Sequence, residues 1–185
     1  MTSIEQLELK PGDIILLQIK GWVGRAVWLM QLINRDASKW THVGIVLPDG
    51  KLFEAQPGGA VISSLADYAG RPAAIVTKYQ RPKHGIPTEY ELADLAPHLT
   101  DFKREEISRT AANLLDVGYN WGTYVYLALY RVGVRPKWLK QRVQDDDRLI
   151  CSQAADLVYS LCNIALFADG RMPYDVTPGD LARLA

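Results

Sequence analysis

Two short segments of the sequence carry a histidine and a cysteine in settings typical of a thiol nucleophile and its base. The first, THVGIV at 41–46, indicates a strand that carries His42 at its start. The second, LICSQAADLVY at 149–159, indicates an apolar helix with Cys151 in its first turn. A thiol attacks as the thiolate, and the positive end of a helix and a neighbouring imidazolium both favour that form. If the two side chains meet, the pair predicts nucleophilic catalysis by Cys151, with His42 as its base and acid.

Glu54 is the candidate for a third group that orients the imidazole. The sequence Pro48-Asp49-Gly50 is typical of a turn, and it joins two apolar runs, HVGIVL and KLFEAQ. A hairpin is therefore predicted, with His42 and Glu54 near opposite positions of its two strands. Side chains that face each other across such strands lie about 5 Å apart at Cβ. The hairpin can thus complete a cysteine–histidine–carboxylate set of the kind that activates a nucleophile.

Each of these residues also has a purely structural interpretation. A lone histidine on an apolar strand, or a lone cysteine on an apolar helix, more often belongs to the core. The acidic run 145–147 opposes thiolate formation; it either caps the helix in solvent or attracts an amine-bearing substrate. The aromatic segment 119–134 either forms one wall of a substrate cleft or packs as core and lid. No cluster of His, Cys, Asp and Glu has the spacing of metal ligands, so neither a metal nor another cofactor is expected.

The composition is that of one ordinary globular domain spanning 1–185. The chain carries 21 basic and 21 acidic residues, and this neutral balance argues against nucleic acid as a partner. The longest uncharged apolar stretch, roughly 117–130, is shorter than the ~18–20 residues that span a bilayer, and the polar N-terminus predicts no signal peptide. On one helix, Cys151 and Cys162 would lie about 16 Å apart, beyond the reach of a disulfide. We therefore expect Cys162 in the core.

Strands are predicted in the first half of the chain and helices in the second, which is an α+β pattern. The expected strands are IILLQI after a turn at 10–13, the hairpin at 42–56, a short segment from 61, and 73–82. Residues 82–98, rich in Pro and charge, are expected to form a surface loop. Helices are expected at 22–33, at 101–117, and from Cys151 to about 166.

The order of these segments resembles a known superfamily. PGDIILL followed by THVGIVLPDGKLFEA resembles the NlpC-type bacterial cell-wall peptidases, in which the cysteine precedes these segments. Here Cys151 follows them, as in the circularly permuted branch of the papain-like superfamily, the YiiX/YaeF-type amidases, and more remotely the lecithin retinol acyltransferase-like proteins. The resemblance implies a permuted papain-like fold, with a small antiparallel sheet packed against the cysteine-bearing helix.

The same resemblance implies roles for individual residues. His42, Glu54 and Cys151 match the branch's order of histidine, polar third residue and cysteine. Tyr119 in GYNWG is similar to a tyrosine whose hydroxyl borders the oxyanion site, and we group Trp121 and Ser152 with it as candidate substrate contacts.

The implied activity is that of a cysteine peptidase or amidase that works through an acyl-enzyme, by default on peptidoglycan stem peptides. Two alternatives stay open: a lipid-acyl or thioester hydrolase or acyltransferase of the same fold, and a non-catalytic assembly module, such as a phage tail or virion component. Without an export signal, the expected location is the cytoplasm, or a phage particle or secretion device that carries the chain to the cell wall.

Overall fold

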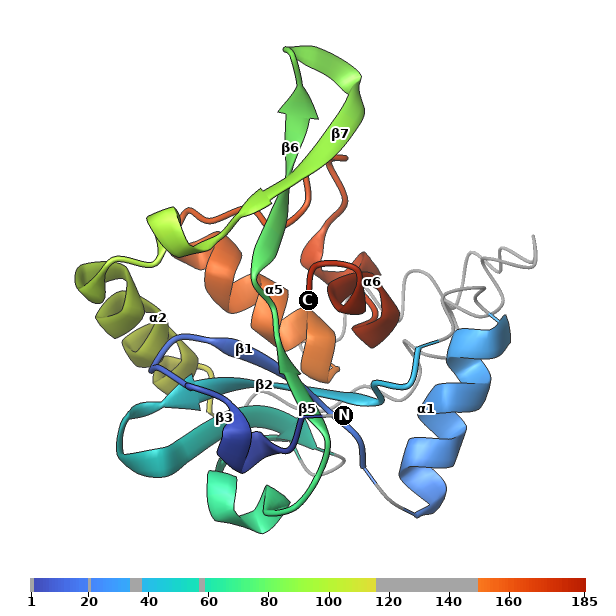
Figure 1. Ribbon diagram of the computed structural model, residues 1–185, viewed down its shortest axis with the longest axis vertical. Helices are drawn as coiled ribbons and strands as arrows, with labels where there is room; N and C mark the ends of the chain where they lie inside the picture. Colours follow the sequence, from blue (N-terminus) through green and yellow to red (C-terminus); the bar gives the residue numbers. More distant parts are fainter. Residues whose placement is uncertain (1, 20, 34–37, 57–58, 116–149) are drawn as a thin grey trace.

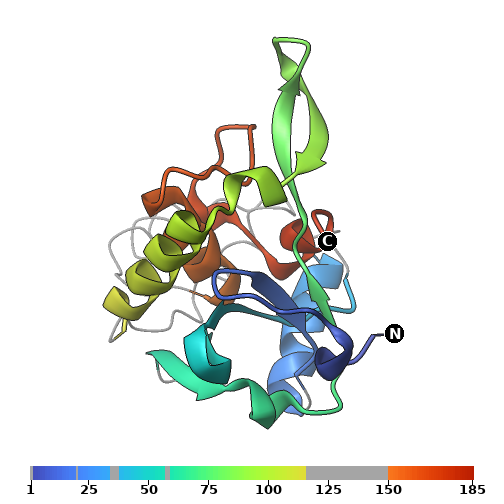
Figure 2. The same ribbon diagram turned by 60° about the vertical axis from the view of Figure 1, so that its left-hand side comes forward.

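The computed structural model describes residues 2–19, 21–33, 38–56, 59–115 and 150–185 (Figures 1 and 2). Its centre is an antiparallel sheet of five strands in the order β4-β3-β2-β1-β5. The strands are β1 (Ile14–Leu17), β2 (His42–Leu47), β3 (Lys51–Gln56), β4 (Gly59–Ser64) and β5 (Ala73–Ile75). The helices are α1 (Trp22–Ile33), α2 (Asp101–Asn113), α5 (Cys151–Leu161) and the short α6 (Pro178–Ala182). This mixed arrangement confirms the α+β prediction.

The central sheet carries an apolar layer on each face because side chains alternate along its strands. One layer, which includes Ile14, Val43, Ile45 and Phe53, packs against α5. The other includes Ile15, Leu17 and Leu52 and packs against Tyr68. His42 is paired with Leu17, and Glu54 with Gly44, so strand alternation places His42 and Glu54 on the Tyr68 face.

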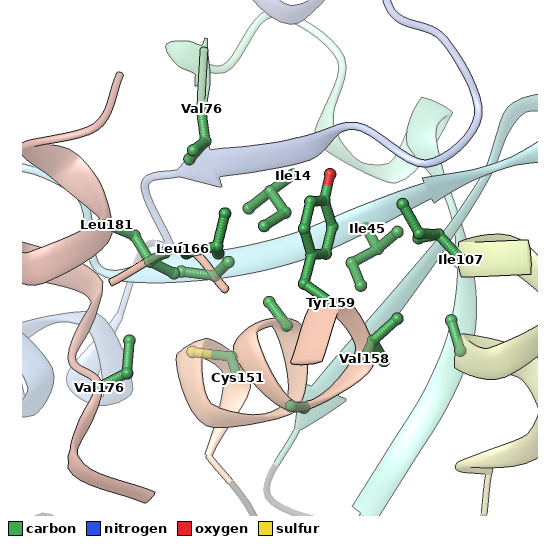
Figure 3. Packing of buried hydrophobic residues seen from close by; sticks show 14 of the residues in the cluster. Ile14, Ile45, Val76, Ile107, Cys151, Val158, Tyr159, Leu166, Val176 and Leu181 are labelled. Atoms are coloured by element: carbon green, nitrogen blue, oxygen red, sulfur yellow. The ribbon is translucent and has the colours of Figure 1, made fainter. Parts of the chain in front are cut away.

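Helix α5 packs on one face of the sheet through a continuous apolar side of the helix (Figure 3). Ala154, Ala155, Val158 and Tyr159 are all buried in the cluster that it shares with β1, β2 and β3. The Tyr159 hydroxyl donates to the backbone carbonyl of Gly12 at 2.6 Å, which ties the helix to the turn before β1. This packing fixes the helix that begins at Cys151.

Helix α5 ends earlier than the apolar pattern predicts. Cys162 is its C-cap, and Asn163 has a φ of 57°, in the left-handed region that stops a helix. The residues after it, Ile164 and Leu166, are buried as part of an irregular segment. The prediction that the helix reaches about 166 is wrong because core burial continues beyond the helix. Cys162 is buried, as predicted.

The hairpin of β2 and β3 forms as predicted. Its turn, Pro48–Gly50, has positive φ values of 60° at Asp49 and 66° at Gly50, which an aspartate and a glycine tolerate well. Gly44 is required on this hairpin for a second reason. A Cβ at Gly44 would lie 2.7 Å from Leu52 Cδ1, so only glycine fits beside the neighbouring strand.

The predicted surface loop at 82–98 is wrong. Strands β6 (Lys78–Lys83) and β7 (Ile86–Asp94) form a two-stranded hairpin that projects from the body of the molecule (Figures 1 and 2). The predicted strand 73–82 accordingly divides between β5 in the central sheet and β6 in this hairpin. Both strands are largely exposed, the apolar side chains of Ile86, Tyr90 and Leu92 on β7 included. Cross-strand ion pairs, Lys78–Asp94 and Arg81–Glu91 among them, join the two strands.

Helix α2 packs against α5 and β2 at the end of the sheet where β1 begins. Thr100 caps it by accepting a hydrogen bond from the Lys103 N–H, and it ends at Asn113, before the predicted end at 117. Arg104 on α2 reaches the carboxylate of Asp13 at 2.6 Å, next to the start of β1. No helix in the described part of the chain is long and apolar enough to cross a membrane.

Candidate active site

His42 lies at the very start of β2, where the strand leaves the segment that follows α1. Its side chain is buried, with 5% of the residue exposed, and its Nε2 atom is hydrogen-bonded to Oε2 of Glu54. Because Gly44 pairs with Glu54, His42 is the diagonal neighbour of the carboxylate rather than the residue opposite it. A diagonal neighbour on the same face of two strands is within reach of a long side chain.

Glu54 is surrounded by hydrogen-bond donors. Its carboxylate accepts from the hydroxyl of Ser63 at 2.5 Å, the amide of Gln56 at 2.7 Å and the hydroxyl of Tyr68 at 2.5 Å, in addition to the His42 ring. A carboxylate that accepts several hydrogen bonds is favoured in its charged form. Burial alone would raise the pKa of Glu54, but the contacts with His42, Ser63 and Tyr68 outweigh it and lower that pKa to about 2. Glu54 is therefore a fixed negative charge behind the imidazole.

Cys151 is the first residue of α5, and its buried thiol is in hydrogen-bond contact with the His42 ring. Since Nε2 of that ring faces Glu54, Nδ1 is left for the sulfur. The N-cap residue Ile150 has no side-chain acceptor for the first-turn N–H groups, whose positive field adds to that of the ring.

His42 contacts both of the other members of this set. Burial opposes its positive charge, yet the sulfur of Cys151 and the carboxylate of Glu54 outweigh burial and raise the pKa of His42 to about 10. The imidazole is therefore an imidazolium at neutral pH. A neighbouring imidazolium favours the thiolate form of a cysteine.

Cys151 and His42 meet because each lies at the start of its element, α5 and β2 respectively. Helix α5 covers one face of the sheet, whereas His42 and Glu54 belong to the other face, so the contact is made where β2 begins and α5 begins. A histidine in the middle of the strand would be separated from the helix by the sheet itself. The position of His42 at the strand end is thus as important as its residue type.

Three residues at this site were not predicted from the sequence: Gln56, Ser63 and Tyr68. Gln56 lies two positions beyond Glu54 and so on the same face of β3, which is a detectable signal. Ser63 on β4 and Tyr68 in the following turn depend on how β4 pairs with β3, which the sequence does not specify. The Tyr68 ring also stacks with the His42 ring at a centroid distance of 6.3 Å. These residues hold Glu54 and, through it, the ring.

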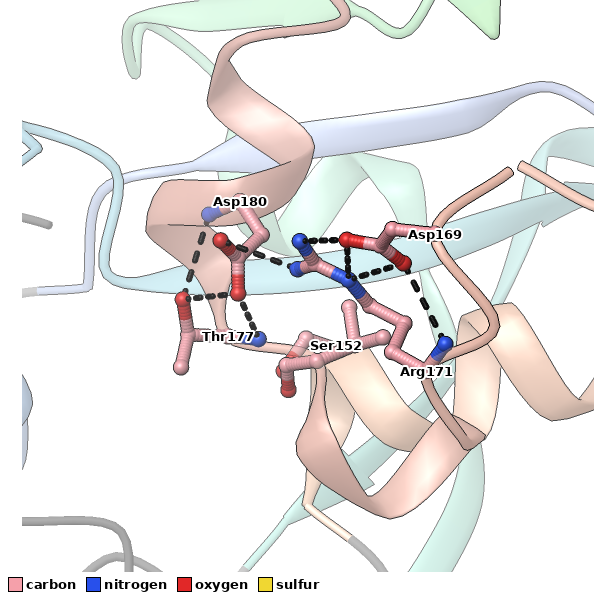
Figure 4. Close-up of polar contacts among 6 residues, drawn as sticks. Ser152, Asp169, Arg171, Thr177 and Asp180 are labelled. Carbon is pink, nitrogen blue, oxygen red and sulfur yellow. Dashed lines mark hydrogen bonds and ion pairs between the residues drawn. The ribbon is translucent and has the colours of Figure 1, made fainter. Parts of the chain in front are cut away.

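Ser152 lies inside the protein. Its hydroxyl donates to the backbone carbonyl of Val176 at 2.8 Å, which fastens the C-terminal segment to the first turn of α5. Figure 4 shows Ser152 beside the polar network of that segment. That segment is ordered in turn by Arg171, which contacts both Asp169 and Asp180. The Ser152 hydroxyl is thus engaged in positioning Cys151. Tyr119 and Trp121 lie outside the described residues.

A groove of about 510 Å³ opens next to His42. It is lined by the end of β1, the first two turns of α1 and the segment that leads into β2, including Thr41, which directly precedes the histidine. The groove thus adjoins the site through the chain neighbour of His42, whereas Cys151, His42 and Glu54 are not among its lining residues.

The fixed charge of Glu54 predicts a specific dependence of stability on acid. Because folding lowers the pKa of Glu54 from 4.5 to about 2, its contribution is present above pH 4.5 and is lost as the pH falls toward 2. The folded wild type should be more stable than Glu54→Gln at pH 7, and about 2 kcal/mol of that difference should disappear between pH 7 and pH 3. Urea unfolding across this range measures it.

Glu89→Gln is the matched control, because Glu89 is an exposed carboxylate on β7 that faces Lys83 at 3.9 Å. Its stability difference from the wild type should stay small at every pH. If the free energies of unfolding of Glu54→Gln and the wild type changed with pH in parallel, folding would not lower the pKa of Glu54.

The fold is similar to that of a solved structure, the metalloprotein yiiX from Escherichia coli O157:H7 (DUF1105). The two chains share 19% sequence identity with a TM-score of 0.51, over 84% of this chain and 67% of the other. No protein-family model matches the sequence, and no curated protein does. Within the described ranges, no group of three or more His, Cys, Asp and Glu residues could hold a metal ion. The similarity thus concerns the α+β fold with its antiparallel sheets, and the chemistry must be argued from the site.

Proposed function

We propose that this protein is a cysteine hydrolase with a circularly permuted papain-like topology, built as a single domain, which cleaves an amide bond through an acyl-enzyme. The observation that carries the proposal is the continuous series of contacts from Cys151 through His42 to Glu54. The similarity to the yiiX fold supports the permuted topology. Peptidoglycan stem peptides are the proposed substrates, on the strength of the sequence's resemblance to cell-wall peptidases.

In the proposed reaction, the Cys151 sulfur attacks the acyl carbon of the amide, and the carbonyl electrons move onto oxygen. The imidazolium of His42 then donates its Nδ1 proton to the leaving amine as the C–N bond breaks, which leaves a thioester on Cys151. Water, deprotonated by the neutral ring, attacks the thioester and releases the acid. The thiolate and the imidazolium form again, so the proton count is restored.

Three features of the fold support these steps. Glu54 stays ionised throughout, so it orients the ring and stabilises its positive charge without taking the proton. The backbone N–H of Cys151 at the start of α5 is a suitable donor to the oxyanion, and such preorganised donors contribute several kcal/mol. The buried setting of the sulfur keeps competing water away from the first step.

Alkylation with iodoacetamide tests the nucleophile directly. If the His42 imidazolium holds Cys151 as a thiolate, Cys151 should be alkylated rapidly at pH 6, well below the pH at which an ordinary thiol reacts. His42→Ala should slow this reaction at pH 6 by at least about tenfold. The rate is followed by mass spectrometry of the peptide that contains Cys151.

Cys162 is the internal control in the same chain. It lies at the other end of α5 from His42, where its sulfur is 3.4 Å from the hydroxyl of Thr110, so it lacks that imidazolium and should react much more slowly than Cys151 at pH 6. Alkylation of Cys151 that is slow at pH 6 and unaffected by His42→Ala would contradict the proposed ion pair and leave a binding module as the better interpretation.

A further inference from the structure

The groove beside His42, which we call the β1–α1 groove, is placed to receive the part of the substrate next to the reacting bond. Leu17 at the end of β1 is paired with His42, and the groove begins with the next residue, Gln18. On the other side, Thr41 lines the groove and precedes His42 in the chain. His42 is not itself a lining residue, but the groove adjoins it through Gln18, which follows its strand partner, and through Thr41, which precedes it.

The groove is positively charged. Arg25 on α1 and Lys39 before β2 both line it, and no aspartate or glutamate does so among the residues that the structure describes. Neither cation forms an ion pair with a carboxylate of the described ranges; the recorded contact of the Lys39 ammonium is with the ring of Trp40, at 4.6 Å from its centroid. Two cations on one concave surface without a carboxylate between them favour an anionic ligand.

The groove is also held in shape by the backbone. The Ile19 N–H donates to the Thr41 hydroxyl at 3.1 Å, and the Thr41 N–H donates to the Leu17 carbonyl at 3.0 Å. Helix α1 packs so closely on this floor that a Cβ at Gly24 would lie 2.0 Å from the Ile19 carbonyl oxygen. The helix that carries Arg25 is thus fixed against the end of β1, next to His42. When the charged groups of a site are already held in place, binding a ligand costs less conformational entropy.

Positive charge is needed here if the substrate is acidic. With a thiolate, an imidazolium and the Glu54 carboxylate, the proposed catalytic set carries one net negative charge in a buried place, which repels an anion. Arg25 and Lys39 offset that charge on the side from which the groove approaches. The guanidinium in particular can bind a carboxylate or a phosphate through two parallel hydrogen bonds.

We propose that the β1–α1 groove binds an oxyanion of the substrate, a carboxylate or a phosphate, through Arg25 and Lys39, so that the enzyme acts on acidic acyl compounds. This inference rests on the proposed function, because it assigns the groove to the substrate of Cys151. It adds a charge preference that neither the fold nor the catalytic set implies.

Two alkylating reagents of nearly equal size, iodoacetate and iodoacetamide, test the proposal at Cys151. In both reactions the thiolate forms a C–S bond and iodide leaves, so the ratio of the two rates reports the preference for negative charge. In Arg25→Gln/Lys39→Gln the iodoacetate-to-iodoacetamide ratio should fall by about fivefold or more relative to the wild type. In 1 M NaCl, where the Debye length is about 3 Å, the two proteins should give similar ratios.

Lys51→Gln is the matched control, because it removes one positive charge from an exposed position at the far end of the β2–β3 hairpin. Its ratio should equal that of the wild type. Arg25→Lys, which keeps the charge, should retain most of the preference. Circular dichroism verifies that each variant is folded, and the two single Gln variants replace the double variant if it is not.

Protection experiments then distinguish the two oxyanions. Succinate and glycerol phosphate are each added during iodoacetate alkylation, and the stronger protector identifies the group that the groove prefers. Equal ratios in the wild type and the double variant, or protection as strong in the variant as in the wild type, would overturn the proposal. Slow alkylation of the wild type by both reagents would instead refute the proposed hydrolase, so the two failures are distinguishable.

Discussion

Replacing Cys151 by alanine is expected to lower turnover by at least about a thousandfold, because Cys151 is the proposed nucleophile that forms the acyl-enzyme. Peptidoglycan fragments and a panel of acyl esters serve as substrates, with products identified by mass spectrometry. The variant should still fold, because Cys151 has a small side chain. Helix α5 is held in place by the buried side chains of Val158 and Tyr159 and by the hydrogen bond of the Tyr159 hydroxyl. Circular dichroism and urea unfolding verify that point.

Cys162→Ala provides the comparison for this experiment. Cys162 is as deeply buried as Cys151 and belongs to the same apolar cluster, but it lies at the opposite end of α5 from His42. The variant should be somewhat less stable and fully active. Activity retained in Cys151→Ala, or lost in Cys162→Ala without unfolding, would mean that the nucleophile is wrongly assigned.

The second large effect is expected at His42. His42→Ala removes the group that carries the proton in both halves of the proposed reaction, and turnover should fall by about 10³–10⁴-fold. Glu54→Gln should reduce turnover less, by about 10–10²-fold, because Glu54 orients the ring and stabilises its charge but transfers no proton. Steady-state rates on the same substrate panel give the comparison.

Added imidazole separates chemistry from structure in this experiment. His42→Ala leaves a space between the sulfur and Glu54, bordered by Tyr68, which a free imidazole can occupy. Partial recovery of turnover with imidazole, in His42→Ala but not in Cys151→Ala, is the expected outcome. If Glu54→Gln proves more damaging than His42→Ala while both variants stay folded, the roles assigned to the two residues are wrong.

The arrangement around Glu54 explains why a buried charge is tolerated there. A carboxylate inside a protein is costly unless donors replace the water that it loses. Glu54 has such donors from two other strand positions, Gln56 and Ser63, and from Tyr68. The same donors prevent rotation of the carboxylate, which keeps the His42 ring aligned with the sulfur. Stability and catalytic alignment thus depend on one network.

The sequence by itself determined the parts of this protein that depend on local pattern. The β2–β3 hairpin follows from its Pro-Asp-Gly turn, α1 and the start of α5 follow from apolar spacing, and the burial of Cys162 follows from its apolar neighbours. His42, Glu54 and Cys151 were selected for the same reason: each lies in a local context suited to its chemistry. These features are encoded within a few residues of where they appear.

Tertiary structure decided what depends on contacts between distant segments. The donors Ser63 and Tyr68 reach Glu54 only because β4 pairs with β3 in one register, and the β6–β7 hairpin depends on a register between two largely exposed strands that the sequence does not specify. The groove with Arg25 and Lys39 arises where α1 packs on the end of β1. The periodicity of a sequence indicates which side of a helix or strand is buried, but not which distant element packs against it. The packing of distant elements determines which charged side chains and which groove lie at the site.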